Sequence, residues 1–311
     1  MRVITVALCA ALPNGRGLAA DPQQPIPTFK SAVALVPITA VVKDRKGRLV
    51  TSLIASDFEV RDNGERRRIV DFQVDRTSPI TLALLVDVSG SMRVGPKLGF
   101  ARKVLERLVS QLQDGRDEVA LFTFDEKLHE EQGFTRHTGG LDSSLSGADP
   151  FGTTSLYDAI AATARRFEEK PSARRAVVVF TDGVDTSSRL TPAEVSGLAS
   201  SIDVPVYIVV TVPPIDRAQY VEREATRPAR AEGDLTDLAA WTGGDLLWAT
   251  APEDAVSRAW QILAELRYQY LMAIESTGQA EWRPIDVRVR DRHMTVRTRS
   301  GYYSRDPLVS K

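Results

Sequence analysis

Residues 80–92, ITLALLVDVSGSM, join a mostly unbroken apolar run to a short polar loop. The apolar part has the length of a strand. Apolar residues at every position are typical of a strand that is covered on both faces of a parallel sheet. Similar runs recur at 119–124, 176–180 and 204–210. These four runs predict four strands of one buried sheet.

The segments between these runs have the apolar spacing of helices. Apolar residues recur every three or four positions in 98–112 and in 156–167. Two further helices are expected to begin at the capping sequences Thr191-Pro192-Ala193-Glu194 and Asp234-Leu235-Thr236-Asp237. Strand and helix therefore alternate from about residue 80 to 267. This order predicts a doubly wound α/β domain whose binding crevice lies beyond the carboxyl ends of the strands.

The segments on either side have the pattern of antiparallel strands. Two strand-like stretches, 34–43 and 57–74, precede the α/β region, and the second contains the hairpin sequence Asp62-Asn63-Gly64. After the α/β region, apolar and polar residues alternate in 285–290 and 294–299.

Neither flank has enough strands for a stable sheet of its own. We therefore expect residues 30–76 and 268–304 to pair into one small β-sandwich. The α/β domain, residues 77–267, is then an insertion between the two halves of this sandwich.

Polar side chains gather where the predicted strands end. Asp87, Ser89 and Ser91 leave the first strand, and Thr181-Asp182-Gly183 follows the strand at 176–180. A third polar segment, Gly152-Thr153-Thr154-Ser155, opens the helix that follows it. At one edge of the sheet, two carboxylates and three hydroxyls would converge. Oxygen ligands without sulfur or nitrogen suit a small hard cation such as Mg²⁺.

These three motifs, in this order, resemble the von Willebrand factor A domain family and its metal-ion-dependent adhesion site (MIDAS). The resemblance covers roughly residues 78–265 and implies a Rossmann-like fold. In that family the Asp-x-Ser-x-Ser loop, a threonine of a second loop and an aspartate of a third hold Mg²⁺. The resemblance implies the ligand set Asp87, Ser89, Ser91, Thr154 and Asp182, with Mn²⁺ or Ca²⁺ as alternative ions.

The threonine ligand has two candidates. Thr154 is preferred to Thr153 because it stands six residues before Ile160, as in the family's Gly-Gly-Thr-x-Leu-Tyr-Asp-Ala-Ile loop. This chain has Gly152-Thr153 where two glycines are commoner. Asp185, with the hydroxyls that follow it, is interpreted as a loop hydrogen-bonding cluster rather than a second cation site.

The whole chain also resembles a group of exported bacterial proteins related to this family. They share a Lys-Gly-Arg turn, an Asp-Phe-Glu-Val segment and a terminal Gly-Tyr-Tyr, which correspond here to Lys46-Gly47-Arg48, 57–60 and 301–303. No biochemical role follows from this second resemblance.

The beginning of the chain has the layout of a secretory signal peptide. Its apolar run, Val3–Leu12, is too short to span about 30 Å of hydrocarbon, and small residues precede Asp21. We expect cleavage after Ala20, with a wrongly chosen start codon as the alternative, and a secreted or periplasmic protein. Removal of residues 1–20 takes away the single cysteine, Cys9, and with it thiol catalysis, zinc-thiolate sites and disulfides.

The charge balance argues against a nucleic-acid partner. Lys and Arg number 40 against 41 for Asp and Glu, so the net charge is -1, and the longest basic run is 66–68. Such a chain offers no electrostatic track for a phosphate backbone.

The motifs favour a binding module over an enzyme. Asp87 stands where a nucleophile elbow around Ser89 would need glycine. A triad of Asp87, Ser155 and either His129 or His137 has no recognisable context, and a metal hydrolase would lack a separate general base.

By resemblance, Mg²⁺ would keep an open position for an Asp or Glu carboxylate of a protein partner. The alternative from another class is a structural scaffold of a cell-envelope assembly, in which the metal only fixes the loops.

Overall fold

The computed structural model describes residues 35–303, apart from 75, 142–144, 146, 169, 171–173, 219–221, 223–232 and 278–280. The predicted signal peptide, residues 1–20, lies outside the described residues. Within the described part of the chain, no helix is both long and apolar enough to cross a membrane.

A six-stranded sheet, in the order β10-β9-β8-β5-β6-β7, forms the centre of the α/β region. Five strands are parallel, and β7 pairs antiparallel with β6 at one edge. The strands are β5 (Thr81–Asp87), β6 (Glu118–Phe124), β7 (Leu128–Thr135), β8 (Arg175–Thr181), β9 (Val206–Thr211) and β10 (Leu246–Ala249). The four strands predicted from the apolar runs are confirmed as the four neighbours β9, β8, β5 and β6.

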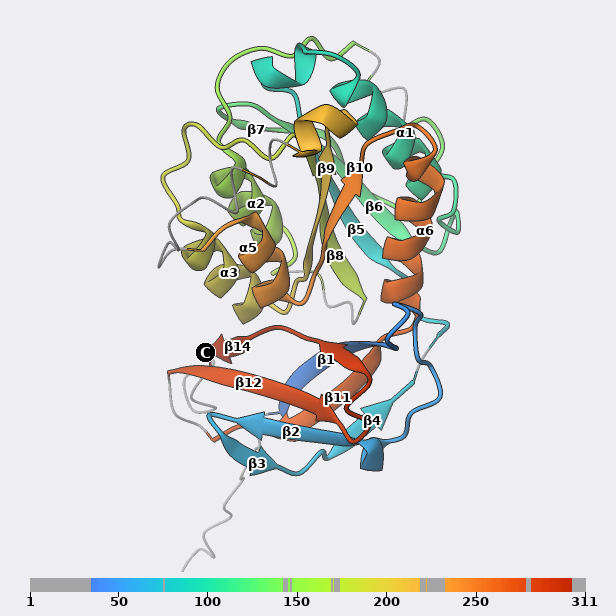
Figure 1. Cartoon of the computed structure of the whole chain (residues 1–311), viewed down its shortest axis with the longest axis vertical. Helices are drawn as coiled ribbons and strands as arrows, with labels where there is room; N and C mark the ends of the chain where they lie inside the picture. Colours follow the sequence, from blue (N-terminus) through green and yellow to red (C-terminus); the bar gives the residue numbers. More distant parts are fainter. Residues whose placement is uncertain are drawn as a thin grey trace, which may run out of the picture. The chain divides into compact units, whose positions relative to one another are not determined.

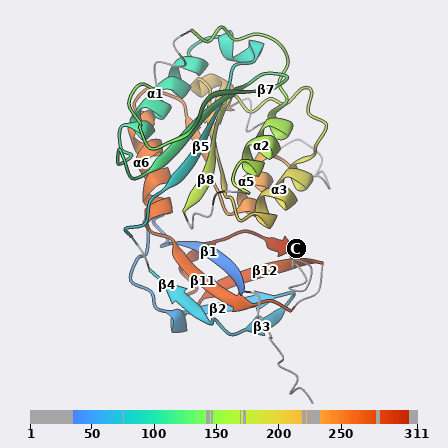
Figure 2. The same cartoon turned by 180° about the vertical axis from the view of Figure 1, so that it is seen from behind.

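Helices cover both faces of this sheet (Figures 1 and 2). On one face lie α1 (Lys97–Val109) and α6 (Asp254–Arg267), and on the other α2 (Leu156–Arg165), α3 (Pro192–Ser201) and α5 (Leu235–Thr242). Each face has its own buried apolar cluster. Both predicted capping sequences are present, because Thr191 accepts from the Glu194 N–H and Asp234 from the Asp237 N–H. The doubly wound α/β prediction is confirmed.

Two four-stranded sheets, β13-β1-β11-β4 and β14-β12-β2-β3, form the flanking β-sandwich (Figure 1). The strands are β1 (Leu35–Lys43), β2 (Phe58–Asp62), β3 (Glu65–Arg67), β4 (Asp71–Gln73), β11 (Tyr270–Glu275), β12 (Trp282–Val289), β13 (Thr295–Arg297) and β14 (Gly301–Tyr303). Asn63 and Gly64, with φ of 52° and 82°, make the tight turn between β2 and β3.

Each sheet of the sandwich combines strands from both ends of the chain. In one sheet β1 pairs antiparallel with β11, and in the other β2 pairs antiparallel with β12. Their inner faces share one apolar core that contains Ile38, Val60 and Tyr270. The prediction of an α/β fold inserted into a β-sandwich is therefore confirmed, while the exact domain limits at 76/77 and 267/268 remain a prediction.

A partly buried ionic network around Glu265 joins the sandwich to the amino-terminal edge of the parallel sheet. The Lys43 ammonium lies 2.7 Å from Glu265, and Arg297 lies 2.5 Å from Asp245 and also contacts Glu265. Burial opposes ionisation of Glu265, which is 1% exposed, but the charges of Arg297 and Lys43 hold its pKa below the ordinary value. The sandwich thus contacts the edge of the sheet opposite to the carboxyl ends.

We expect Glu265→Gln to lower the free energy of unfolding by about 1–3 kcal/mol, because the partly buried Lys43 and Arg297 lose a charged acceptor. The measurement is urea unfolding at neutral pH. The matched control is Asp286→Asn, whose ion pair with Arg288 is exposed and should contribute less than about 0.5 kcal/mol. Equal effects of the two substitutions would show that the network does not stabilise the fold.

Candidate metal centre

The first loop of the predicted site begins at Asp87, the last residue of β5, whose side chain is fully buried. One carboxylate oxygen accepts the Ser89 N–H at 2.9 Å, and the other accepts the Thr181 hydroxyl at 2.6 Å. The Ser89 and Ser91 hydroxyl oxygens lie 3.2 Å apart. The structure therefore brings the three predicted ligands of this loop together.

The second loop is held against the first by backbone hydrogen bonds. The Phe151 N–H donates to the Val88 carbonyl at 2.9 Å, and the Gly90 N–H donates to the Gly152 carbonyl at 3.1 Å. A Cβ at position 90 would lie only 3.3 Å from that Gly152 oxygen. The close approach of the two loops therefore favours glycine at position 90.

Thr154 connects the second loop to the third. Its N–H donates to the Thr186 hydroxyl at 2.9 Å, and its carbonyl accepts the N–H groups of Thr186 and Ser187 at 2.9 and 3.0 Å. Thr154 is 3% exposed, and its hydrogen bonds to described residues are made by its N–H and carbonyl and not by its hydroxyl. Thr153 is exposed, and its hydroxyl accepts from Ser187. Of the two threonine candidates, Thr154 is thus the one whose hydroxyl makes no hydrogen bond to another described residue.

The third loop contributes Asp182, which directly follows β8. Its carboxylate is 2% exposed, and one oxygen accepts the Val184 N–H at 3.2 Å. The other oxygen lies 2.8 Å from the Lys97 ammonium. Sequence reasoning did not identify Lys97 or the hydroxyl of Thr181 as members of this site. Thr181 directly precedes Asp182 in the sequence, which was an available signal, whereas Lys97 lies 85 positions away from Asp182.

The three loops form one rim at the carboxyl ends of β5 and β8. The electrostatics of this rim favour a cation. Burial raises the pKa of Asp87 to about 6, hydrogen bonds from Ser89 and Thr181 oppose that rise, and the nearby Asp182 charge adds to it. Two buried carboxylates that repel one another are stabilised when a cation lies between them. Within the described ranges, no cluster of three or more His, Cys, Asp or Glu side chains was found. The donor set is two carboxylates with hydroxyls, which fits a hard cation such as Mg²⁺.

Asp185 has a local structural role. It accepts the Leu156 N–H at the start of α2 at 2.9 Å and the Ser188 hydroxyl at 2.6 Å. The interpretation of this segment as a hydrogen-bonding cluster is confirmed.

The residues of the alternative hydrolase triad form other contacts. His129 is exposed and lies 3.4 Å from Asp125, while the Ser155 hydroxyl lies 2.9 Å from that of Ser187. Asp87 is bonded to Ser89 and Thr181 instead. The structure therefore does not bring Asp87, a histidine and Ser155 into one hydrogen-bonded chain.

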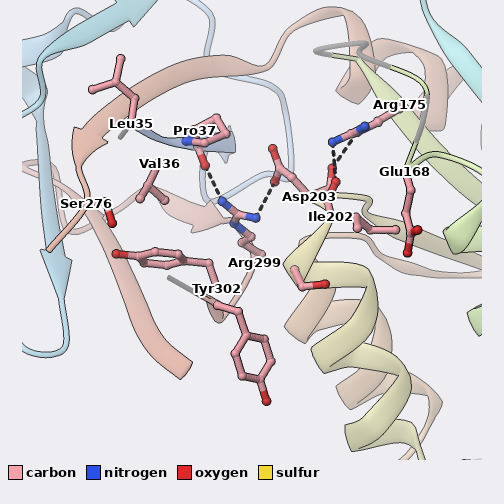
Figure 3. A pocket seen from close by; sticks show the side chains of 12 residues that line it. Leu35, Val36, Pro37, Glu168, Arg175, Ile202, Asp203, Ser276, Arg299 and Tyr302 are labelled. Carbon is pink, nitrogen blue, oxygen red and sulfur yellow. Dashed lines mark hydrogen bonds and ion pairs between the residues drawn. The ribbon is translucent and has the colours of Figure 1, made fainter. Parts of the chain in front are cut away.

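A separate pocket of about 320 Å³ lies between the sandwich and the end of α3 (Figure 3). Two arginines in its wall are bonded to backbone carbonyls. Arg299 donates to Ser200 and Pro37 at 2.5 Å each, and Arg175 donates to Lys170 at 2.9 Å. These guanidinium groups hold chain segments together, so the pocket is not the candidate site.

The family model described as von Willebrand factor type A domain matches residues 82–184, a range that includes the five predicted ligands. The resemblance seen in the sequence is confirmed. No curated protein matches the chain.

Three solved structures illustrate what the chain is similar to. An aerotolerance-related membrane protein from Bacteroides fragilis, with multiple mutations to serines, is 21% identical over 60% of this chain and 98% of its own, with a TM-score of 0.47. BatB from Bacteroides thetaiotaomicron is 19% identical over 60% and 98%, with a TM-score of 0.46. Proximal thread matrix protein 1 from the mussel byssus, with a zinc-occupied MIDAS motif, is 13% identical over 66% and 49%, with a TM-score of 0.47.

Proposed function

We propose that this protein is an extracytoplasmic binding module in which a divalent cation, Mg²⁺ by preference, recognises a carboxylate of a protein partner. The proposed ligands are Asp87, Ser89, Ser91, Thr154 and Asp182. The observation that carries the proposal is the convergence of three hydrogen-bonded loops on two buried carboxylates and the buried Thr154. Von Willebrand factor type A domains are typical protein-interaction modules, in agreement with this chemistry.

The charge of the site explains why a partner carboxylate would bind. Direct ligation by both Asp87 and Asp182 would leave a dication with little net positive charge. If one carboxylate is held through water, the cation remains electrophilic and attracts a further carboxylate from outside. The bound cation would supply this attraction. The protein supplies the oxygen ligands and would leave one coordination position open to the partner.

Apolar side chains beside the loops support a protein as the partner. Val94 and Phe151 are 67% and 77% exposed, and they lie in the first and second loop regions of the site. Exposed apolar groups next to a charged centre provide contact area that a free ion or small acid would not use.

The proposal includes export and excludes catalysis. The predicted signal peptide, residues 1–20, supports a secreted or periplasmic location. Besides the proposed ligands, the described residues at the site include Lys97, whose ammonium is paired with Asp182 and is not left free as an acid or base. A structural scaffold with a purely structural metal is the competing function.

The test is Thr154→Ala with Thr153→Ala as its matched control, because Thr154 is a buried residue and a proposed ligand, whereas Thr153 is exposed and its hydroxyl accepts from Ser187. A partner is first isolated by pull-down from the exported proteome with and without EDTA. We expect Thr154→Ala to weaken partner binding by roughly tenfold or more, equivalent to about 1.4 kcal/mol, while the unfolding midpoint changes little.

Other outcomes separate the alternatives. Equal affinity of wild type and Thr154→Ala would reject recognition through the metal. A parallel fall of affinity and stability would favour the scaffold, and metal-dependent turnover of a peptide or ester would favour an enzyme.

A further inference from the structure

Lys97 lies beside the proposed metal site but is not one of its proposed ligands. It is the first residue of α1, and its ammonium lies 2.8 Å from the Asp182 carboxylate. The Lys97 side chain is only 13% exposed and the carboxylate 2%, so the pair is largely shielded from water. A shielded pair of this kind is stronger than a surface ion pair.

The position of Lys97 is otherwise unfavourable for a cation. The amino end of a helix carries partial positive charge, and α1 has no acidic residue in its first turn to offset it. Asp182, from the end of β8, supplies the missing negative charge. Lys97 is therefore held at this place by the same carboxylate that is proposed to bind the metal.

The two buried carboxylates of the rim are unequally compensated. Asp87 is bonded to a backbone N–H and a neutral hydroxyl, whereas Asp182 is bonded to a full positive charge. A dication that approaches both carboxylates would meet the Lys97 ammonium beside Asp182. The two cations repel one another across a few ångströms of partly buried space.

We propose that Lys97 is a built-in competitor of the metal: it neutralises Asp182 in the metal-free protein and must leave this carboxylate when a divalent cation binds. The inference rests on the proposed metal site. Competition by Lys97 makes metal binding weaker and more readily reversible than the oxygen ligands alone would allow. The Lys97–Asp182 pair also makes the metal-free protein more stable than it would be with two uncompensated carboxylates at the rim.

The experiment measures binding of Mn²⁺ alone to the full chain, by isothermal titration calorimetry and by electron paramagnetic resonance of the free ion. Lys97→Met removes the charge and keeps most of the side-chain volume. Lys103→Met is the matched control, because Lys103 lies in the same helix and is exposed. Lys97→Gln serves as a second variant in case the methionine variant does not fold, and Lys97→Arg keeps the positive charge.

We expect Lys97→Met and Lys97→Gln to bind Mn²⁺ roughly tenfold or more tightly than wild type and to unfold at a lower temperature in EDTA. Lys97→Arg and Lys103→Met should keep the wild-type affinity. If the neutral variants bind Mn²⁺ as weakly as wild type, or more weakly, competition by Lys97 is rejected while the metal site stands. If neither wild type nor the neutral variants bind Mn²⁺, the metal site and this inference both fail.

Discussion

Saturating Mg²⁺ is expected to raise the unfolding temperature of the wild-type protein, and Asp87→Ala is expected to abolish that rise. A ligand that binds only the folded state at about 1,000 times its Kd stabilises it by about 4.1 kcal/mol. For a domain of this size, that corresponds to a rise of roughly 8–16 °C. Asp87 is chosen because its carboxylate lies at the end of β5 and is fully buried among the proposed ligands.

Asp87→Ala also removes the acceptor for the Ser89 N–H and the Thr181 hydroxyl, so it will lower stability even without metal. The measured quantity is therefore the difference in unfolding temperature between Mg²⁺ and EDTA for each variant. Asp87→Asn keeps the size of the side chain and should lose the metal response too. Asp149→Ala is the control, because Asp149 is an exposed acid that pairs with Arg93 of the first loop. A full Mg²⁺ response in both Asp87 variants would show that the site is assigned wrongly.

The predicted part of the site depends on motifs that are contiguous in the sequence. Asp87, Ser89 and Ser91 lie within five residues, and strand order alone places Asp182 at the same edge of the sheet. Lys97 could not be predicted in this way. Its partner lies 85 positions away, and a lysine at a helix start is ordinarily a solvated side chain.

The fold shows the same distinction between features carried by contiguous residues and features made by residues that meet only in the folded chain. The central strands were predictable because burial on both faces leaves an unbroken apolar run. The edge strand β7 has a largely polar sequence, LHEEQGFT, without a buried residue, and β10 has only four residues, so neither has such a run. The network of Lys43, Glu265 and Arg297 was not predictable either, because its members come from three separate segments that meet only in the folded chain.

Pairing between the two ends of the chain leads to the largest expected effect. Deletion of residues 268–311 removes both neighbours of β1, namely β11 and β13, and removes β12 from beside β2. What remains of the sandwich is the short hairpin of β2 and β3 with two unpaired strands, β1 and β4. A lone hairpin is marginally stable at best in water, and the apolar residues of the inner faces would lose their cover.

We therefore expect the truncated chain to lose hydrogen-exchange protection throughout residues 35–43 and 58–73, measured by mass spectrometry on peptides from these ranges. Peptides from β5 and β8 provide the internal reference, because their partner strands all lie within the retained residues. Deletion of residues 304–311 alone is the control, since it leaves every paired strand of the sandwich in place. Protection at the wild-type level in residues 35–43 after the larger deletion would mean that β1 does not depend on β11 and β13. Loss of protection there, with protection kept in β5 and β8, would show that the two ends of the chain fold as one sandwich and that the α/β region folds independently of it.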